Sequence, residues 1–311
     1  MKKFSLFFTA LALVFVLAAC SLDNGSSSKE GTSSKEGDKT TKDSFTIGLS
    51  ISTLNNPFFV TLNEGAQAKA DELGAKLTVA DAQDNASKQA SDVEDLIQQG
   101  VDLLLINPVD SAAVASAVEA ANAAGIPVIT VDRSSEGGEV VSHIASDNVA
   151  GGELAGQYLT ELVGKDAKVV ELEGVAGSSA ARDRGEGFNK AIDGKLNVVA
   201  KQTANFNRAE GLTVMENILQ ANPDVVGVFA HNDEMALGAL EAIEAAGKDI
   251  KIVGFDATDD AKAAVKAGKM AATVAQKPDE IGSIAIETAI KHLKGETVEA
   301  SIPVELELIK K

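Results

Sequence analysis

Cysteine, histidine and aromatic side chains are all scarce in this sequence of 311 residues, and tryptophan is absent. The single cysteine, Cys20, excludes a disulfide framework. The three histidines, His143, His231 and His292, lie too far apart in the sequence to form a short-range metal-binding motif. Aromatic residues make up only 4% of the chain, so its cores must consist mainly of aliphatic side chains. An aromatic residue in a polar turn is therefore unusually informative.

Basic residues are also in deficit. The chain has 28 Lys and Arg against 46 Asp and Glu, which gives a formal net charge of −18. Binding to nucleic acid requires clustered positive charge, so this composition argues against a nucleic-acid partner. The sequence also lacks a Gly-x-Ser-x-Gly nucleophile motif and a phosphate-binding loop that ends in Lys-Ser or Lys-Thr. We therefore expect no cofactor and no enzymatic activity.

Residues 1–20 have the pattern of a signal peptide. Lys2 and Lys3 give a positive start, and Phe4–Val16 is an apolar run too short for a stable transmembrane helix. The segment Leu17-Ala18-Ala19-Cys20 resembles the lipobox of bacterial lipoproteins, in which the cysteine is acylated and becomes the mature N-terminus. The alternative is an ordinary signal peptide with an incidental cysteine. We favour lipidation of Cys20, because the only cysteine of the chain stands where the signal ends.

Residues 21–44 are a low-complexity segment of Ser, Gly, Thr, Lys and Glu, which predicts a flexible tether. From Phe45 onward, short apolar runs alternate with helical patterns, as expected for parallel sheets that are covered on both faces. In the first half we expect strands at Phe45–Ile51, Lys76–Ala80, Leu103–Ile106, Val128–Val131 and Val141–Ala145, and helices at Pro57–Leu73, Ser87–Gln99 and Ser111–Ala124.

The alternation restarts after Asp147. Here we expect helices at Val149–Val163, Ser179–Ile192, Arg208–Ala221 and Glu234–Ala246, and strands at Lys168–Glu173, Asn197–Gln202, Val225–Ala230 and Ile250–Phe255. The C-terminal part predicts a strand at Ala271–Ala275, a helix at Asp279–Lys294 and a single final strand at Ile302–Ile309. Because these elements follow two complete α/β units, we expect the chain to cross back to the first unit.

A weak internal repeat relates the two halves. Pro127–Asp132 matches Lys251–Asp256, and the strand that ends at Asn107 corresponds to the strand that ends at Asn232. The predicted fold class is therefore α/β, with two doubly wound parallel-sheet lobes joined by a hinge of several strands. Gly151-Gly152 at the start of a helix lacks the remaining spacing of a dinucleotide-binding motif, and we interpret it as a packing feature.

The stretch Ser52–Phe59 stands between a predicted strand and a predicted helix, where ligands bind in open α/β sheets. Asn56 is suited to cap the helix, and Pro57 is suited to its first position. Phe58 and Phe59 point about 100° apart on a helix, so they cannot share one core face. Local structure thus accounts for Asn56 and Pro57 without a ligand, but it does not account for both phenylalanines.

Polar and aromatic residues gather at the ends of other predicted strands as well. Carboxylates, amides, arginines and aromatic faces are the groups that recognise a sugar, since they bond to vicinal hydroxyls and pack on the apolar face of the ring. For any single polar residue a purely structural role is about equally plausible. The candidates are Ser52, Asn56, Phe58, Phe59, Asp132, Arg133, Arg182, Arg184, Phe206, Asn232, Asp256 and Gln276.

One enzymatic alternative has to be weighed against this expectation. Asp132 and Asp256 have the residue type of the paired carboxylates of a glycosidase. We discount this reading because Arg133, Arg182 and Arg184 are expected to keep such carboxylates ionised, which is unfavourable for a general acid.

Six segments resemble the ribose/galactose group of periplasmic substrate-binding proteins. The resemblance extends from Phe45 to Lys311, and it is dense in Ser52–Phe59, Leu104–Pro108, Val140–Asn148, Ser179–Phe188, Asn232–Leu240 and Val253–Asp256. It implies ligand-binding roles, carried over position by position, for Ser52, Asn56, Phe58, Phe59, Asp132, Arg133, Arg184, Phe206, Asn232, Asp256 and Gln276. It implies one lobe formed by residues 45–146 plus 279–306 and another formed by residues 147–278 plus 307–311, with hinges near Asp147, Pro278 and Pro303–Leu306.

The resemblance also implies a function. The expected protein is an extracytoplasmic, monomeric receptor that captures D-ribose by hinge closure and delivers it to an ABC import permease and its ATPase. The lipobox departs from the plain signal of the familiar periplasmic members and suggests a receptor held on the cell membrane by lipid on Cys20, as in Gram-positive bacteria. Alternatives are a receptor for another pentose or a furanose-type signal molecule, and a sugar-processing enzyme. The ligand core of a transcriptional repressor is disfavoured by the signal peptide and by the lack of a DNA-binding motif before Phe45.

Overall fold

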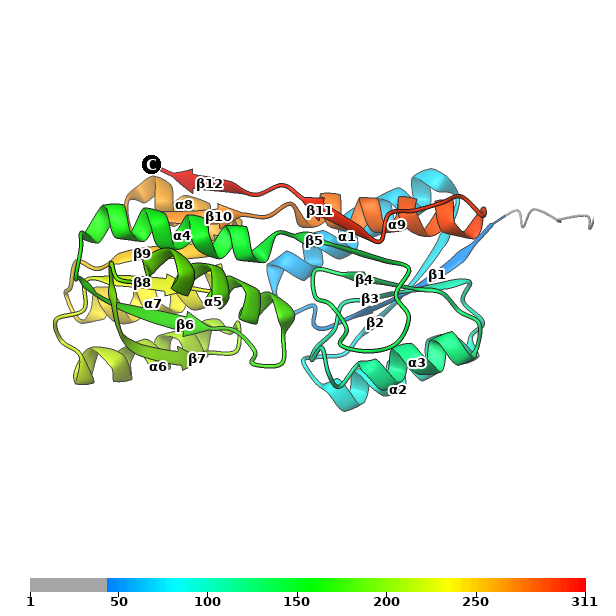
Figure 1. Cartoon of the computed structure of the whole chain (residues 1–311), viewed down its shortest axis with the longest axis horizontal. Coiled ribbons are helices and arrows are strands. Elements are labelled where there is room, and N and C mark those ends of the chain that lie inside the picture. The colour runs from blue at the N-terminus through cyan, green and yellow to red at the C-terminus, as the bar shows by residue number, and fades with distance from the viewer. Residues whose placement is uncertain (1–43) are drawn as a thin grey trace, which may run out of the picture. The chain divides into compact units, whose positions relative to one another are not determined.

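The computed structural model describes residues 44–311, which form two α/β lobes (Figure 1). The expected signal peptide, the lipidation site Cys20 and the tether up to residue 43 lie outside the described residues. Within residues 44–311, no helix is both long enough and apolar enough to cross a membrane. The fold class expected from the alternation of strands and helices is confirmed.

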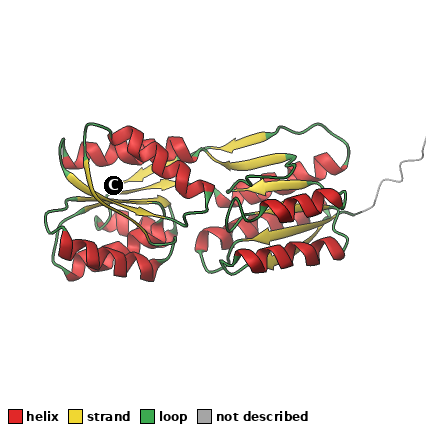
Figure 2. Cartoon of the chain, turned by 60° about the horizontal axis from the view of Figure 1, so that its bottom comes forward, coloured by secondary structure: helices red, strands yellow, loops and turns green. Residues whose placement is uncertain are grey.

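The first lobe contains a six-stranded sheet with the order β11-β5-β4-β3-β1-β2, in which all neighbouring strands are parallel. Two pairs of helices cover its faces, α1 with α9 and α2 with α3 (Figure 2). These elements are β1 (Thr46–Ile51), α1 (Pro57–Leu73), β2 (Lys76–Asp81), α2 (Ala86–Gln98), β3 (Leu103–Ile106), α3 (Ala115–Ala123), β4 (Val128–Val131), β5 (Ser142–Ser146), α9 (Pro278–Leu293) and β11 (Ser301–Val304).

The second lobe repeats this arrangement with the order β12-β10-β9-β8-β6-β7, and only the edge strand β12 is antiparallel to its neighbour. Helices α4 and α5 pack on one face, and α6 and α7 pack on the other. The elements are α4 (Asn148–Val163), β6 (Lys168–Glu173), α5 (Ser179–Ile192), β7 (Asn197–Thr203), α6 (Arg208–Ala221), β8 (Gly227–Ala230), α7 (Asp233–Ala245), β9 (Lys251–Asp256), α8 (Asp259–Ala267), β10 (Ala272–Ala275) and β12 (Glu307–Lys310).

The internal repeat is confirmed by the sheet orders. Strand β4, which is followed by Asp132, and strand β9, which ends at Asp256, occupy equivalent positions in the two sheets. The same holds for β3 and β8. The chain passes between the lobes three times, from β5 to α4, from β10 to α9 and from β11 to β12. The inner strands of each sheet are parallel, so their carboxyl ends lie along one edge of that sheet. The polar residues at the strand ends therefore gather along this edge in each lobe.

Three expectations about the elements were wrong. The single final strand at Ile302–Ile309 is two strands, because Glu305 and Leu306 leave the first sheet and the chain continues antiparallel in the second. Helix α3 begins at Ala115 instead of Ser111, since Asp110 accepts hydrogen bonds from the Ala112 and Ala113 amides in a preceding turn. Helix α8 had not been expected. The other bounds agree within two residues.

Helix α1 follows the expected pattern of caps. The Oδ1 atom of Asn56 accepts a hydrogen bond from the Phe58 amide at 2.9 Å, and Pro57 occupies the first turn. Gly74 ends the helix with a φ of 68°, in the left-handed region that glycine tolerates. Phe59, Leu62, Ala66 and Ala70 recur at helical spacing and are buried, whereas Leu73 at the end of the helix is 45% exposed.

Glycines allow the helix pairs to approach closely where the site is built. A Cβ atom on Gly152 of α4 would overlap the carbonyl oxygen of Arg184 in α5, and one on Gly187 of α5 would overlap the carbonyl oxygen of Val149. The expectation that Gly152 serves packing is confirmed. This contact fixes α5, and with it Arg184, against the start of α4.

Replacing Gly187 by alanine is therefore expected to destabilise the protein by about 1–3 kcal/mol, because the added methyl group has no room between two backbones. Gly185→Ala, two positions earlier in α5, is the matched control, since its Cβ atom would meet only side-chain atoms of Glu171 and His231, at 3.2 and 3.3 Å. Urea unfolding of both variants tests this difference. Equal unfolding free energies for the two variants would contradict the packing argument.

Candidate functional site

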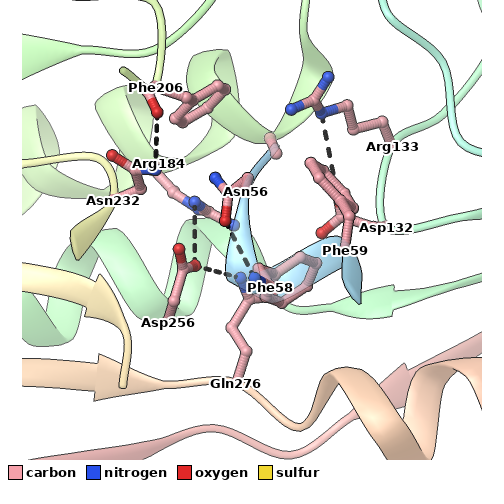
Figure 3. Close-up of a pocket in the computed structure, with 11 residues that line it drawn as sticks. Asn56, Phe58, Phe59, Asp132, Arg133, Arg184, Phe206, Asn232, Asp256 and Gln276 are labelled. Carbon is pink, nitrogen blue, oxygen red and sulfur yellow. Dashed lines mark hydrogen bonds and ion pairs between the residues drawn. The ribbon is translucent and has the colours of Figure 1, made fainter. Parts of the chain in front are cut away.

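Ten of the eleven residues expected to bind a ligand line one cavity between the carboxyl edges of the two sheets (Figure 3). The cavity has an empty volume of about 240 Å³. Its walls come from the β1–α1 turn and the end of β4 in the first lobe, and from α5 and the ends of β7, β8, β9 and β10 in the second. The lining residues are Asn56, Phe58, Phe59, Asp132, Arg133, Ala180, Arg184, Phe206, Asn232, Asp256 and Gln276.

Two of the candidates lie elsewhere. Ser52 is fully buried behind the cavity wall, where its amide donates to Oδ1 of Asn107 at 3.1 Å. Arg182 points outward and forms an ion pair with Glu136 at 2.7 Å, so Arg184 is the arginine of this helix that faces the cavity. Ala180 completes the lining. It was not predicted from the sequence, because a small apolar side chain has no hydrogen-bonding group that would indicate a binding role.

Each lobe contributes a carboxylate and an arginine to the cavity. Oδ2 of Asp132 lies 3.7 Å from Nε of Arg133, and Oδ1 of Asp256 lies 3.8 Å from Nη1 of Arg184. These side chains are 3–5% exposed, and both pairs are longer than a direct hydrogen bond. Their charges therefore attract each other while polar atoms remain free to bond with a ligand.

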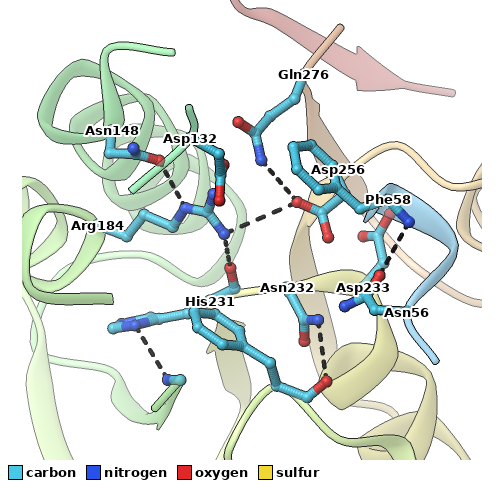
Figure 4. Close-up of polar contacts among 12 residues, drawn as sticks. Asn56, Phe58, Asp132, Asn148, Arg184, His231, Asn232, Asp233, Asp256 and Gln276 are labelled. Carbon is cyan, nitrogen blue, oxygen red and sulfur yellow. Dashed lines mark hydrogen bonds and ion pairs between the residues drawn. The ribbon is translucent and has the colours of Figure 1, made fainter. Parts of the chain in front are cut away.

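Arg184 is held by neutral acceptors behind the cavity (Figure 4). Its Nε atom donates to Oδ1 of Asn148 at 2.8 Å, and Nη1 donates to the carbonyl oxygen of His231 at 2.7 Å. Its guanidinium Cζ lies 3.9 Å from the centre of the Phe255 ring. These contacts fix the direction of the guanidinium group before any ligand binds, which lowers the entropic cost of binding.

Aromatic rings form the remaining walls. Phe58 and Phe59 meet edge to face with ring centres 5.1 Å apart, so both are buried although they point in different directions. The Arg133 guanidinium lies between Phe59 and Phe206, with its Cζ 5.1 and 5.2 Å from the two ring centres. Rings from opposite lobes thus enclose a narrow space whose walls are apolar and whose edges are polar.

Three buried polar atoms at the cavity have no hydrogen-bond partner among residues 44–311. They are Oδ1 of Asp132, Nε of Arg133 and Oε1 of Gln276, whose own Nε2 donates to Asp256 at 2.8 Å. Buried polar groups in folded proteins are nearly always paired. Of the eight unpaired buried side-chain atoms within residues 44–311, three gather on residues that line this one cavity, which requires an explanation. A small ligand with several hydroxyl groups would supply both the donors and the acceptor that these atoms need.

Burial dominates the electrostatics of the cavity. It raises the pKa of Asp256 to about 7, and the carboxylates of Asp132 and Glu234 act in the same direction, whereas Arg184 and Gln276 oppose it. Burial also lowers the pKa of both Arg133 and Arg184 from the ordinary value. The expectation that arginines keep both carboxylates firmly ionised is thus wrong for Asp256, because desolvation outweighs the attraction of Arg184.

The lobes also touch directly beside the cavity. The Ser134 amide of the first lobe donates to Oγ of Ser179 in the second at 2.9 Å, and the Ser179 amide donates to Oγ of Ser111 at 3.2 Å. The Ser111 amide in turn donates to the carbonyl oxygen of Gly177 at 2.9 Å. These bonds close one side of the cavity, so the structure shows the two lobes in a closed arrangement.

Several residues that support the site were not found from the sequence. Asn107 and Asn148 bond to Asp132 and Arg184, and the buried carboxylate of Asp233 accepts from Thr258 and Thr273 beneath the cavity. The sequence around a buried asparagine does not show whether its side chain orients a charged residue or only caps a local helix or strand end. Among the described residues, no group of three or more His, Cys, Asp or Glu side chains could hold a metal ion.

Comparison with known proteins agrees with this geometry. A family model described as a periplasmic binding protein domain matches residues 47–297. The chain is 55% identical over 308 residues to the ribose import binding protein RbsB of Bacillus subtilis (strain 168), and the match covers 99% of each chain. It is 58% identical over 268 residues to the ribose import binding protein RbsB of Escherichia coli (strain K12), covering 86% of this chain and 90% of the relative.

A solved structure of an ABC transporter solute binding protein from Mycobacterium smegmatis, with bound glycerol, has the same fold. Its TM-score is 0.83 at 39% identity, and the match covers 86% of this chain and 94% of that one. Two lobes that enclose a polar cavity are the arrangement of this class of solute receptors. The chain belongs to the periplasmic binding protein family. Members of this family are extracytoplasmic receptors and not enzymes, so the family decides against the glycosidase reading that the arginines alone did not exclude.

The buried carboxyl of Asp256 predicts a specific pH dependence of stability in the sugar-free protein. Its pKa in the folded state is about 7, above the ordinary value of 3.8. The stabilising contribution is therefore complete below the unfolded pKa and is lost as the pH rises through about 7, by at most about 1.4 kcal/mol per pH unit. The variant Asp256→Asn lacks this titration, so we expect it to gain stability relative to the native protein between pH 5 and pH 8. Urea unfolding at several pH values measures the difference, and parallel pH profiles would contradict the raised pKa.

Proposed function

We propose that this chain is the substrate receptor of a ribose importer and that it captures D-ribose in the cavity between its lobes. The observation that carries the proposal is the presence of three unpaired buried polar atoms, on Asp132, Arg133 and Gln276, in a cavity walled by aromatic rings. The names of the relatives at 55% and 58% identity support ribose as the sugar.

Each group in the cavity has a role that follows from its chemistry. Asp132 and Asp256 accept hydrogen bonds from sugar hydroxyls, whereas Arg133 and Arg184 donate to hydroxyl and ring oxygens. Asn56, Asn232 and Gln276 contribute amide groups, and Phe58, Phe59 and Phe206 pack on the apolar faces of the ring. Ser52 acts from behind the wall, by fixing the turn that carries Asn56.

Capture takes place by closure of the lobes. In our proposal, one lobe comprises residues 45–146 plus 279–306 and the other residues 147–278 plus 307–311, with hinges near Asp147, Pro278 and Pro303–Leu306. A sugar that bonds to both lobes binds the closed form better than the open form and shifts the population toward it. The direct bonds between Ser111, Ser134 and Ser179 support such a closed state.

The closed receptor then presents its sugar to a membrane partner. We propose that it acts as a monomer and delivers ribose to an ABC permease, which is powered by its ATPase. The name of the solved relative, an ABC transporter solute binding protein, supports this assignment.

We further propose that lipid on Cys20 holds the receptor on the outer face of a Gram-positive cell membrane. The signal that ends in Leu17-Ala18-Ala19-Cys20 carries this proposal. The match to the Bacillus subtilis relative covers 99% of both chains, so that relative is similar in the N-terminal segment too, whereas the match to the Escherichia coli relative covers 86% of this chain. One acyl chain binds a membrane weakly, so stable anchoring requires more than one.

Calorimetric titration with pentoses and hexoses tests the assignment of the sugar. We expect tight binding of D-ribose and little response to glucose or galactose, because the relatives at 55% and 58% identity are named for ribose. Arg133→Ala and Asp256→Ala are each expected to cost at least about 2 kcal/mol of ribose affinity, since buried partners are then left unpaired. Lys190→Ala is the control, because Lys190 is exposed, lies outside the cavity and pairs with Glu153 of the same lobe.

Unchanged affinity in the Arg133 and Asp256 variants would overturn the site. Galactose bound as tightly as ribose would overturn the specificity, and tighter binding of another pentose or of a furanose-type sugar would replace ribose as the ligand.

The anchor is tested in cells of a Gram-positive host. Cys20→Ala is expected to abolish incorporation of a labelled fatty acid and to release the receptor from the membrane fraction, because the only thiol of the chain is lost. Ser21→Ala, which keeps the cysteine, serves as the control and should remain labelled. Persistent labelling of the Cys20→Ala protein would refute lipidation at this position.

A further inference from the structure

We propose that Asn107 is a positioning residue for sugar binding, which acts by holding the Asp132 carboxylate with one oxygen directed to the cavity. Asn107 follows β3, is completely buried and does not line the cavity. The inference rests on the proposed function of Asp132 as an acceptor for a sugar hydroxyl.

The first step of the argument is the set of bonds that the Asn107 side chain makes. Its Nδ2 atom donates to the carbonyl oxygen of Val131 at 3.1 Å and to Oδ2 of Asp132 at 3.3 Å. Its Oδ1 atom accepts from the Ser52 amide at 3.1 Å. One side chain thus joins the ends of β1 and β4, the two strands that carry the first lobe's share of the cavity wall.

The second step concerns the backbone at Asp132, which adopts a rare conformation. Its φ is 62°, in the left-handed region that residues other than glycine rarely adopt, and the Arg133 amide donates to the carbonyl oxygen of Val131 at 2.6 Å. Such a three-residue turn is strained, and it persists only where the surroundings determine it. Asn107 bonds to the same Val131 carbonyl and to the Asp132 side chain, so it holds both parts of the turn.

The third step is the asymmetry of the Asp132 carboxylate. Asn107 and Arg133 both approach Oδ2, at 3.3 and 3.7 Å, whereas Oδ1 has no hydrogen-bond partner among residues 44–311. Occupation of one oxygen prevents the carboxylate from rotating, because rotation would give up the Asn107 bond. The other oxygen therefore stays available to a ligand.

Asn107 is itself fixed by Gln89 of α2, which is 1% exposed. The Gln89 Nε2 atom donates to the Asn107 carbonyl oxygen at 2.8 Å, and its Oε1 atom accepts from the Val109 amide at 2.8 Å. Gln89 thus fixes the Asn107 backbone, while the Ser52 amide and the Val131 carbonyl hold the Asn107 side chain. Because Asn107 is itself held in place, it can pre-organise the Asp132 carboxylate for binding.

The internal repeat supports a role for this position in the binding site. His231 follows β8, the strand equivalent to β3, and its amide donates to the Leu172 carbonyl of β6 as the Asn107 amide donates to the Ser50 carbonyl of β1. His231 is completely buried, and its carbonyl oxygen accepts from Nη1 of Arg184. The residue that directly follows this strand thus holds a charged cavity residue in both lobes, Asp132 in one and Arg184 in the other.

Titration of Asn107→Ala with D-ribose, alongside the native protein, tests the proposal. We expect the variant to lose ribose affinity by about tenfold, because residues joined by a hydrogen bond are energetically coupled. The matched control is Asn122→Ala. Asn122 also clamps a loop of the first lobe, with Nδ2 donating to the Glu139 carbonyl at 3.1 Å and Oδ1 accepting from the Glu139 amide at 2.7 Å, but it lies far from the cavity lining.

Both alanine variants should lose unfolding free energy in urea, but only Asn107→Ala should lose affinity. Ribose affinity of Asn107→Ala within twofold of native would overturn the proposal, and absence of ribose binding by the native protein would instead overturn the proposed function. If Asn107→Ala does not fold, Asn107→Ser takes its place, because its short hydroxyl does not span the distance to Asp132 and the same loss is expected.

A double-mutant cycle with Asp132→Asn separates positioning from general loosening. If Asn107 acts through Asp132, its removal should change affinity less than about twofold once Asp132 has been replaced. A loss of the same size in both backgrounds would show that Asn107 acts independently of Asp132 and would overturn the proposal. Should Asp132→Asn bind no ribose measurably, the comparison of the Asn107 and Asn122 variants decides alone.

Discussion

The structure depends on one constraint, which is the burial of two carboxylates and two arginines where the sheets of the two lobes face each other. Such charges are costly to remove from water unless they are paired and hydrogen-bonded. Asp132, Arg133, Arg184 and Asp256 are partly paired among themselves, at distances that leave some atoms unsatisfied. The cavity is thus complementary to a ligand that supplies the missing hydrogen bonds, and its empty form is the less favourable one.

Packing and hydrogen bonds in the surrounding fold fix the positions of these four charged side chains. Close packing of α4 and α5 through Gly152 and Gly187 fixes the helix that carries Arg184. Asn148, at the start of α4 and next to a crossing between the lobes, accepts from the same arginine. In the first lobe, Asn107 joins the two strand ends that carry the cavity residues. Neutral amides therefore orient the charged groups, and they do so without neutralising the charges that a polar ligand recognises.

Much of this architecture could be predicted from the sequence. Periodicity placed most of the helices and strands, and the repeat of Pro127–Asp132 in Lys251–Asp256 predicted two equivalent lobes. The choice of Arg184 over Arg182 required resemblance to a family, because both lie at the start of one helix with the same chemistry. The division of the last strand, the buried asparagines and the raised pKa of Asp256 depend on contacts between segments far apart in the chain, which local patterns do not encode.

The three crossings between the lobes have a consequence for biosynthesis. Strand β11 and helix α9 complete a lobe that begins at β1, and β12 completes the other lobe after the third crossing. Neither sheet can therefore assemble fully before β11 and β12 have been synthesised. Contacts between such distant segments slow folding. A receptor of an extracytoplasmic family has to cross a membrane before it folds, and slow assembly of both sheets is compatible with that order.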